Sequence, residues 1–379
     1  MARNNFQPVF EETETAIRDR MIAKVEADGW RAEPGDFMYD AVAPSPAEIK
    51  QLQINQDTIL ASRFALYAEG SDLDDCLYDV GLTRIGATHN KRALLITADA
   101  GVNIPLGQQL YAVVLDAQGQ PLKFTADAAV NWATSTALTL NITCQAVGTI
   151  GNLAAGSQFV LQPSIPGVRI IADQGTTILA RDPETDEEAW ERYDFKATHP
   201  DTGGNKYDLQ RWAQEVAGVG KAKVIPRWAG VNTSKVLLAG LDLTPATTQV
   251  VNDTQAYLDP GATGLGDGKV PLGNACTVAA ADNLAVNIVV TGAQYAAGAI
   301  AADVKAAFQT SVKAYLKELV FEVDPTTKIP LPVIYNKIYG LLAFTIGLKS
   351  FSTLTINGGT ADLTVTQTEA PTLGTVTGL

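Results

Sequence analysis

Several residue types that often carry chemistry are scarce in this chain of 379 residues. Its two histidines, His89 and His199, lie far apart and have no cysteine at ligand spacing, so no metal site is expected on them. The three cysteines, Cys76, Cys144 and Cys276, form no C-x-x-C pair, which predicts buried, reduced thiols. The sequence therefore indicates no metal and no cofactor.

Long apolar runs and blocks of basic residues are also missing. No run reaches the roughly 18 apolar residues of a membrane span, so no membrane insertion is expected. Residues 1–5 lead into acidic residues without the apolar stretch of a secretory signal. The net charge is −13 and Lys and Arg are scattered, so nucleic acid is not an expected partner. The acidity serves solubility or complements a basic partner.

Motifs of common enzyme classes are missing too. The chain contains no H-E-x-x-H and no G-x-S-x-G. The run 261–269 does not fit a phosphate-binding loop, because Thr263 stands at the first glycine position and Val270 at the Ser/Thr position. The acids at 186–188 and Glu191 lie where the first turns of a capped helix favour acids. We expect no enzyme and no catalytic residue.

What remains is the composition of a multidomain globular protein. The length suggests roughly two to three domains. Hydrophobic residues make up 46% and charged residues 18%, an ordinary folded balance. Residues 10–83 show helical periodicity, with acids before an apolar stripe of Ile17, Met21 and Val25.

A second helix is predicted to begin at Ser45. Ser45 is expected to be the N-cap, with Pro46 at the first helical position and Glu48 completing a capping box. Ile49 and Leu52 begin the apolar side of this helix.

The hydrophobic period changes to two near Lys91. Leu94, Ile96 and Ala98 alternate with more polar neighbours, and similar short runs continue to Leu161 between glycine and proline turns. This pattern predicts a small β-sandwich or barrel of about 75 residues.

Helices return after about residue 168 and then alternate with strands. Thr185 and Glu188 predict one helix start, Thr244 and Pro245 another, and strands are expected at 284–291, 352–357 and 361–366. The fold class is α+β multidomain, with an N-terminal helical segment, a central β-domain and C-terminal α+β units of split βαβ type. The expected domains are residues 1–88, 89–167, 168–283 and 284–379.

Three tryptophans and two tyrosines cluster between residues 190 and 228, namely Trp190, Tyr193, Tyr207, Trp212 and Trp228. They fit core packing, and they also fit an interface, since Trp and Tyr are enriched at binding hot spots.

Ordered short motifs over nearly the whole chain give a family resemblance. They are 46–48, 70–74, 81–84, 103–107, 147–153, the stretch 182–228, 258–260, 270–275 and 370–374. In this order they resemble the baseplate J-like family of contractile phage tails and phage-tail-like bacteriocins, in the version found in Gram-positive bacteria. His199-Pro200 and the pair Leu209-Gln210 depart from the family pattern, as does the missing Gly-Gly before residue 182.

The resemblance implies a structural role. Family members are inner baseplate wedge proteins that link the central hub and tube to the contractile sheath and transmit the contraction trigger. The implied partners are a second wedge protein, a sheath-initiator protein and the central hub or spike proteins, with self-association as dimers in a six-fold ring. The implied location is the baseplate of a virion or tail-like particle, assembled in the bacterial host cytoplasm. The resemblance fits an infectious phage and a bacteriocin-like particle equally well.

Amphipathic N-terminal helices without a large core of their own are expected to pack on partner helices. The candidate interface residues are Ile17, Met21, Val25, Ile49, Leu52, Trp190, Tyr193, Trp212 and Trp228. The alternative function is a tail-tip receptor-binding protein or adhesin, which the β-domain would fit and the helical N-terminus disfavours.

Overall fold

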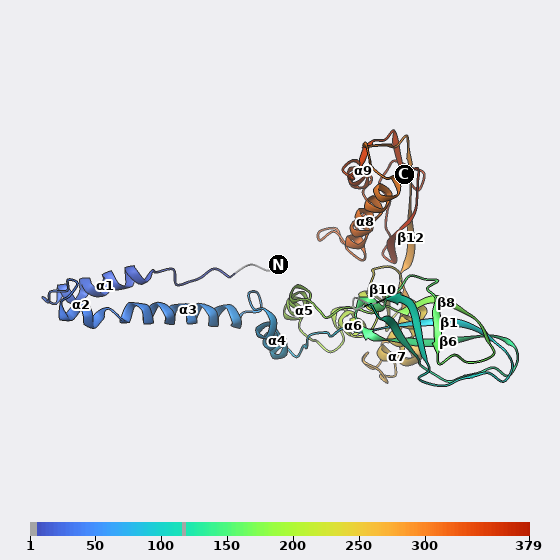
Figure 1. Cartoon of the computed structure of the whole chain (residues 1–379), viewed down its shortest axis with the longest axis horizontal. Helices are drawn as coiled ribbons and strands as arrows, with labels where there is room; N and C mark the ends of the chain where they lie inside the picture. Colours follow the sequence, from blue (N-terminus) through green and yellow to red (C-terminus); the bar gives the residue numbers. More distant parts are fainter. Residues whose placement is uncertain (1–5, 116–118) are drawn as a thin grey trace. The chain divides into compact units, whose positions relative to one another are not determined.

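A computed structural model describes residues 6–115 and 119–379 (Figure 1). Residues 1–5, with which the expectation of no secretory signal begins, lie outside the described residues. The chain divides into two units. The helical unit comprises residues 1–86 and 183–200, and the main unit comprises residues 87–182 and 201–379.

The helical unit is built on a pair of long helices. In Figure 1, α1 (Glu14–Ala27) lies beside α3 (Ser45–Arg63), and the short α2 (Phe37–Val42) lies at the turn between them. The segment before α1 also follows α3, because the Asp57 carboxylate accepts the backbone N–H groups of Val9 (2.9 Å) and Phe10 (3.3 Å). Lys50 donates to the carbonyl of Phe10 at 2.9 Å.

The hydrophobic core of this unit lies where α3 ends. There α4 (Gly70–Asp79) packs against α5 (Asp186–Thr198), although more than 100 residues separate them in sequence. The core contains Leu73, Leu77 and Trp190. The domain boundary expected at residue 88 therefore leaves out a helix on which this core depends.

The two helix starts expected from capping motifs differ in outcome. Thr185 caps α5 as predicted, with its hydroxyl accepting from the Glu188 N–H and the Glu188 carboxylate accepting from the Thr185 N–H. The predicted cap at Ser45 is wrong. Ser45 is already helical, and the preceding Ala43 and Pro44 continue from α2 in right-handed helical conformation, so no capping hydrogen bond forms.

The first part of the main unit is a curled antiparallel β-sheet. Within the described residues its strands run in the order β7-β3-β4-β6-β1-β8. Alternate residues of β1 point inward, so that Leu94, Ile96 and Ala98 are buried in its core. The strands and the short helix of this domain are β1 (His89–Ala98), β2 (Asn103–Ile104), β3 (Gln109–Leu115), β4 (Pro121–Ala126), β5 (Val130–Asn131), β6 (Thr136–Val147), η1 (Thr149–Gly151), β7 (Phe159–Gln162) and β8 (Val168–Ile178).

Strand β8 differs from the sequence-based expectation, which ended the β-domain at residue 167. It pairs antiparallel with β1, and register shifts interrupt that pairing near Lys91, Arg92 and Ala98. Each shift changes which β8 side chains face the core. Strand β8 therefore lacks the strict alternation of buried and exposed residues by which strands are recognised in a sequence.

A second domain follows with a three-stranded sheet in the order β11-β10-β9. Strands β9 and β10 form an antiparallel hairpin, whereas β10 and β11 are parallel and joined through α7, which makes a βαβ unit. The elements are α6 (Lys206–Gln214), β9 (Val219–Pro226), β10 (Thr233–Gly240), α7 (Thr248–Leu258), η2 (Pro260–Ala262) and β11 (Ala275–Ala280). Thr247 caps α7, three residues after the predicted start.

The last domain repeats this mixed arrangement in the order β15-β12-β16, with β12 and β16 parallel. Helix α8 supplies Phe308, Val312 and Leu316 to its core. The elements are β12 (Asp282–Thr291), β13 (Gln294–Tyr295), α8 (Ala301–Leu319), α9 (Tyr335–Ala343), β14 (Leu348–Ser350), β15 (Thr353–Ile356) and β16 (Glu369–Thr377). The α+β multidomain class is confirmed, but the strand predicted at 361–366 is wrong, since only Leu363 forms an isolated bridge there.

Candidate interaction surfaces

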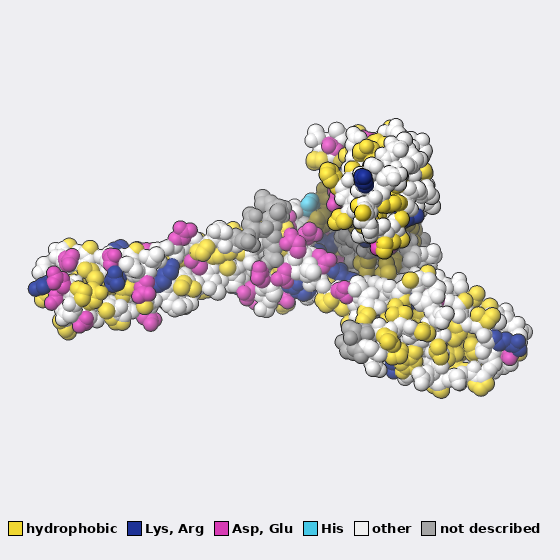
Figure 2. Space-filling model, turned by 45° about the horizontal axis from the view of Figure 1, so that its top comes forward, with side chains coloured by type: hydrophobic (Ala, Val, Ile, Leu, Met, Phe, Trp, Pro, Cys, Tyr) yellow, Lys and Arg dark blue, Asp and Glu magenta, His cyan; other side chains and the backbone are white. Residues whose placement is uncertain are grey.

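Negative charge is concentrated in the helical unit. This unit contains 10 of the 28 Lys and Arg residues and 22 of the 41 Asp and Glu residues, which gives it a formal charge of −12 out of −13. Figure 2 shows acidic side chains spread along it. The main unit is close to neutral, so the acidity of the chain is concentrated in the helical unit.

The candidate residues of α1 and α3 occupy both the inside and the outside of the helix pair. Ile17 is fully buried, and Met21, Val25 and Ile49 are partly buried. Leu52 is 60% exposed, and Ile59, seven residues further along α3, is equally exposed. Seven residues are two helical turns, so these two side chains share one face of α3. This pair of helices therefore presents apolar side chains to solvent.

The aromatic candidates at α5 belong to the packed end of the helical unit. Trp190 is buried against Leu73 and Leu77, and Tyr193 packs at the edge of the same cluster. Trp190 thus joins α4 and α5.

The acids near the start of α5 are engaged in structural contacts. The Asp186 carboxylate accepts from the Gly70 N–H (3.0 Å) and pairs with Arg84 (2.8 Å). Glu184 is buried, pairs with Arg192 at 2.8 Å and accepts from the Ile85 N–H at 2.9 Å. Together with the Thr185–Glu188 capping box, these contacts hold α5 against the segment after α4.

In the second domain of the main unit, Asp208 fixes the start of α6. It is fully buried and accepts from the N–H groups of Thr202, Gly204 and Asn205. Burial alone would raise the pKa of Asp208, but these backbone donors and Arg211 outweigh it, and the pKa lies below its ordinary value. Asp208 was not among the predicted candidates, although an acid three positions after Asn205 is a capping-box signal.

The two tryptophans of this domain differ in exposure. Trp212 lies on α6 and packs at the edge of the core formed with Leu209 and Ala213. Trp228 follows β9 in the turn to β10 and is 45% exposed, with Lys235 Nζ 5.1 Å from the centre of its ring. Of the predicted aromatic candidates, Trp228 is the one whose ring is most available to a partner.

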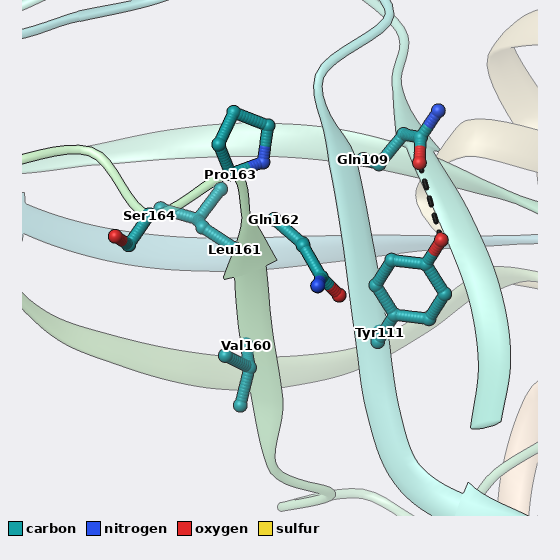
Figure 3. Close-up of a pocket in the computed structure, with 7 residues that line it drawn as sticks. All are labelled: Gln109, Tyr111, Val160, Leu161, Gln162, Pro163 and Ser164. Atoms are coloured by element: carbon teal, nitrogen blue, oxygen red, sulfur yellow. Dashed lines mark hydrogen bonds between the residues drawn. The ribbon is translucent and has the colours of Figure 1, made fainter.

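An open hollow of about 680 Å³ lies over β3 and β7 (Figure 3). Gln109, Tyr111, Val160 and Gln162 line it, and the Tyr111 hydroxyl donates to the Gln109 side-chain oxygen at 3.1 Å. No lining residue is charged, so the hollow offers shape and a few amide groups without acid–base chemistry. In Figure 2 the face of the β-domain turned to the viewer likewise has few charged side chains, with hydrophobic side chains scattered over it.

Nothing in the described part of the chain gathers three or more His, Cys, Asp or Glu residues into a metal-binding group. The Nδ1 atom of His89 lies 2.8 Å from the Cys144 carbonyl oxygen, and His199 stacks on Phe195. The three cysteines are buried and form no disulfide, and burial raises the pKa of each thiol. Among the described helices, none is long and apolar enough to cross a membrane.

Comparison with known proteins identifies three consecutive family matches. Residues 93–179 match the Baseplate J-like protein barrel domain, 201–280 the Baseplate J-like central domain and 286–379 the Baseplate J-like protein C-terminal domain. The barrel match includes β8, in agreement with the sheet.

Relatives are found in bacterial prophages and in phages. The chain is 30% identical to the phage-like element PBSX protein XkdT of Bacillus subtilis, over 97% of both chains. It is 30% identical to baseplate protein gp47 of Escherichia phage Mu, over 40% of this chain and 41% of that protein. A solved structure of the anti-feeding prophage baseplate aligns with 97% of this chain and 99% of that chain, at 11% identity and a TM-score of 0.35. The three domain matches and the full-length relative place this chain in the Baseplate J-like family.

Proposed function

We propose that this protein is a structural wedge protein in the baseplate of a contractile tail or tail-like particle. In this role it links the central hub and tube to the sheath and transmits the contraction trigger. Family membership supports a baseplate role, as does the likeness to the Mu protein, whose name is baseplate protein. The proposed partners are a second wedge protein, a sheath-initiator protein and the hub or spike proteins, with dimers arranged in a six-fold ring.

The charge and the exposed apolar side chains of the helical unit are the observations that carry this proposal. This unit combines a −12 formal charge with apolar side chains exposed on α3, and its hydrophobic core cluster lies around α4 and α5, whereas between α1 and α3 the buried apolar side chain is Ile17. Exposed apolar side chains on one helix face are typical of helices that dock against others. We infer that α1 and α3 join a helix bundle with partner proteins.

We also infer a non-catalytic role. The acids that best resemble catalytic carboxylates, Asp186 and Glu188, support helix packing and capping. Purified protein is therefore expected to leave peptidoglycan intact. Cleavage that disappears in Asp186→Asn or Glu188→Gln, with the fold retained, would contradict this inference.

Deleting the gene from a particle producer tests the wedge role. Loss of sheathed particles in electron micrographs is the expected result, because sheath assembly needs the baseplate. Fully sheathed particles that fail to bind cells would instead indicate the alternative, a tail-tip receptor-binding protein.

Point variants then test the bundle. Leu52→Gln together with Ile59→Gln alters exposed side chains and should leave the protein folded while reducing its incorporation into particles. Ile170→Gln, at a 59% exposed position in the β-domain, is the matched control. Equal incorporation of both variants would exclude the proposed α3 surface. Truncation of residues 1–83 is a poorer test, because it would remove the packing partners of Trp190.

A further inference from the structure

The second domain of the main unit brings two loops together at one end of its sheet. The turn between β9 and β10 lies beside the loop that leads into β11, because Ala275 donates its N–H to the Asn232 carbonyl at 2.9 Å. The Asn274 side chain also donates to the Ser234 hydroxyl at 3.1 Å. These bonds place residues 227–232 and 264–274 at the same end of the sheet.

These loops expose four large apolar side chains. Val231, Leu265 and Leu272 are 71%, 64% and 78% exposed, and Trp228 is the fourth. We call them, together with Arg227 and Lys235, the hairpin patch. Single exposed apolar residues are ordinary on a protein surface, but a cluster on adjoining loops is typical of an interaction site.

The turn is held in one conformation. Arg227 and Asn232 have φ of 57° and 60°, in the left-handed region, which side-chain-bearing residues enter only when other contacts hold them there. The Arg227 N–H donates to the Thr233 carbonyl at 2.7 Å, and the Thr233 hydroxyl donates to the Gly230 carbonyl at 2.8 Å. The patch is thus preorganised, which lowers the entropy cost of binding.

The hairpin is basic. No acid occurs between Glu215 and Asp242, whereas four Lys or Arg residues do. Lys221 pairs with Glu322, and Lys223 is partly buried. Neither Arg227 nor Lys235 forms an ion pair with any described carboxylate. In the neighbouring loop, Asp267 and Lys269 offset each other in charge.

We propose that the hairpin patch docks onto an acidic surface of a different protein in the baseplate, with Trp228 and Val231 entering an apolar groove there. The cations at Arg227 and Lys235 would pair with carboxylates around that groove, and Trp and Arg are the residue types enriched at interface hot spots. A nucleic acid is a poorer fit. Three of the four apolar side chains are aliphatic and cannot stack on bases, and the whole chain is acidic. This proposal rests on the proposed baseplate role.

The experiment places a photo-crosslinking residue, p-benzoylphenylalanine, at position 231 of the full chain in a particle producer. The control carries it at Ile329, which is 61% exposed in the C-terminal domain. Purified particles are irradiated and the crosslinked peptides are identified by mass spectrometry. The expected product joins position 231 to an acid-rich segment of another baseplate protein, with a yield well above that of the control.

Charge and apolar variants complete the test. Arg227→Glu with Lys235→Glu, and separately Trp228→Ala, should lower the crosslink yield roughly tenfold or more, as truncation of hot-spot residues does. A crosslink to a second copy of this chain, to nucleic acid or to a basic segment would overturn the proposal, as would a yield no higher than at position 329. Absence of the wild-type protein from particles would instead remove the proposed function itself.

Discussion

Arg92 and Asp173 form a fully buried ion pair that joins β1 to β8. Arg92 Nη2 lies 2.8 Å from Asp173 Oδ2, Nε lies 3.1 Å from Oδ1, and both side chains are completely shielded from solvent. The guanidinium also donates to the Leu153 and Ala154 carbonyls, and the carboxylate accepts from the Gly156 and Ser157 N–H groups. The pair thereby fixes the loop that leads into β7.

Removing one partner of this pair should destabilise the β-domain strongly. Arg92→Met leaves the Asp173 charge buried without its counterion, which typically costs about 3–5 kcal/mol. Arg92→Met with Asp173→Asn should recover part of the loss, since the asparagine oxygen still accepts from the backbone. Urea unfolding, with hydrogen exchange of β1 and β8 peptides, measures both effects.

The exposed pair between Arg169 and Asp99 provides the control. Its atoms are 2.7 Å apart, but Arg169 is largely solvated. Arg169→Met should therefore cost at most about 1 kcal/mol. Equal losses from Arg92→Met and Arg169→Met would show that burial of the first pair has no energetic consequence.

The contrast between Thr185 and Ser45 gives a second prediction. Thr185→Ala removes the hydroxyl that accepts the Glu188 N–H and should cost about 1 kcal/mol. Ser45→Ala, which the sequence alone would rank as equally harmful, should change stability by less than about 0.5 kcal/mol because Ser45 makes no cap. Thermal or urea midpoints decide the order, and a larger loss at Ser45 would contradict the helix start described above.

This contrast shows what local sequence can and cannot determine. The Ser45 motif fits a capping box, but a cap also requires an extended residue at the N-cap, and the helical turn from α2 into α3 excludes it. A regular element with an uninterrupted period, such as β12, was predicted close to its bounds because one face of it is buried along much of its length.

The long-range features could not be predicted in the same way. Arg92 occupies an inward position of β1, in phase with Leu94 and Ile96, which is a signal for a buried counterion. Its partner was hidden because register shifts disrupt the pattern of β8. The packing of α5 on α4 joins segments remote in sequence, and so the expected domain boundaries separated them. Whether the candidate interface residues bind partners stays a prediction.

The lowered pKa of Asp208 leads to a prediction about pH. Its folded-state pKa lies below the unfolded value near 3.9, so the ionised carboxylate stabilises the fold above about pH 4, and this contribution is lost as pH falls through the folded-state pKa. Asp208→Asn should cost about 1–3 kcal/mol at pH 7, since buried N–H groups lose a charged acceptor. The difference from wild type should shrink below about pH 4.

Asp267→Asn is the control for this titration, because Asp267 is exposed and no hydrogen bond to its side chain is found among the described residues. Its urea midpoint should follow that of wild type at each pH. A stability difference between Asp208→Asn and wild type that stayed constant from pH 7 to pH 3 would show that the ionisation of Asp208 is not responsible.

Two glycines without positive φ should respond to alanine in opposite directions. Gly220 lies in β9 where the pairing with β10 shifts register, and a Cβ there would lie 2.3 Å from the Gly240 carbonyl oxygen and 2.9 Å from the Leu241 Cα. These are backbone atoms that cannot rotate away, so Gly220→Ala should cost about 1–3 kcal/mol or more.

Gly340 lies inside α9 with nothing within 4 Å of the added carbon. Gly340→Ala should instead stabilise the fold by about 0.5–1 kcal/mol, because alanine restricts the unfolded chain and favours the helix. Calorimetry should show midpoints shifted in opposite directions, and hydrogen exchange should show faster opening of β9 and β10 only in Gly220→Ala. Unchanged exchange in that variant would mean that the two strands can separate enough to admit a methyl group, and the close approach at Gly240 would then have no structural role.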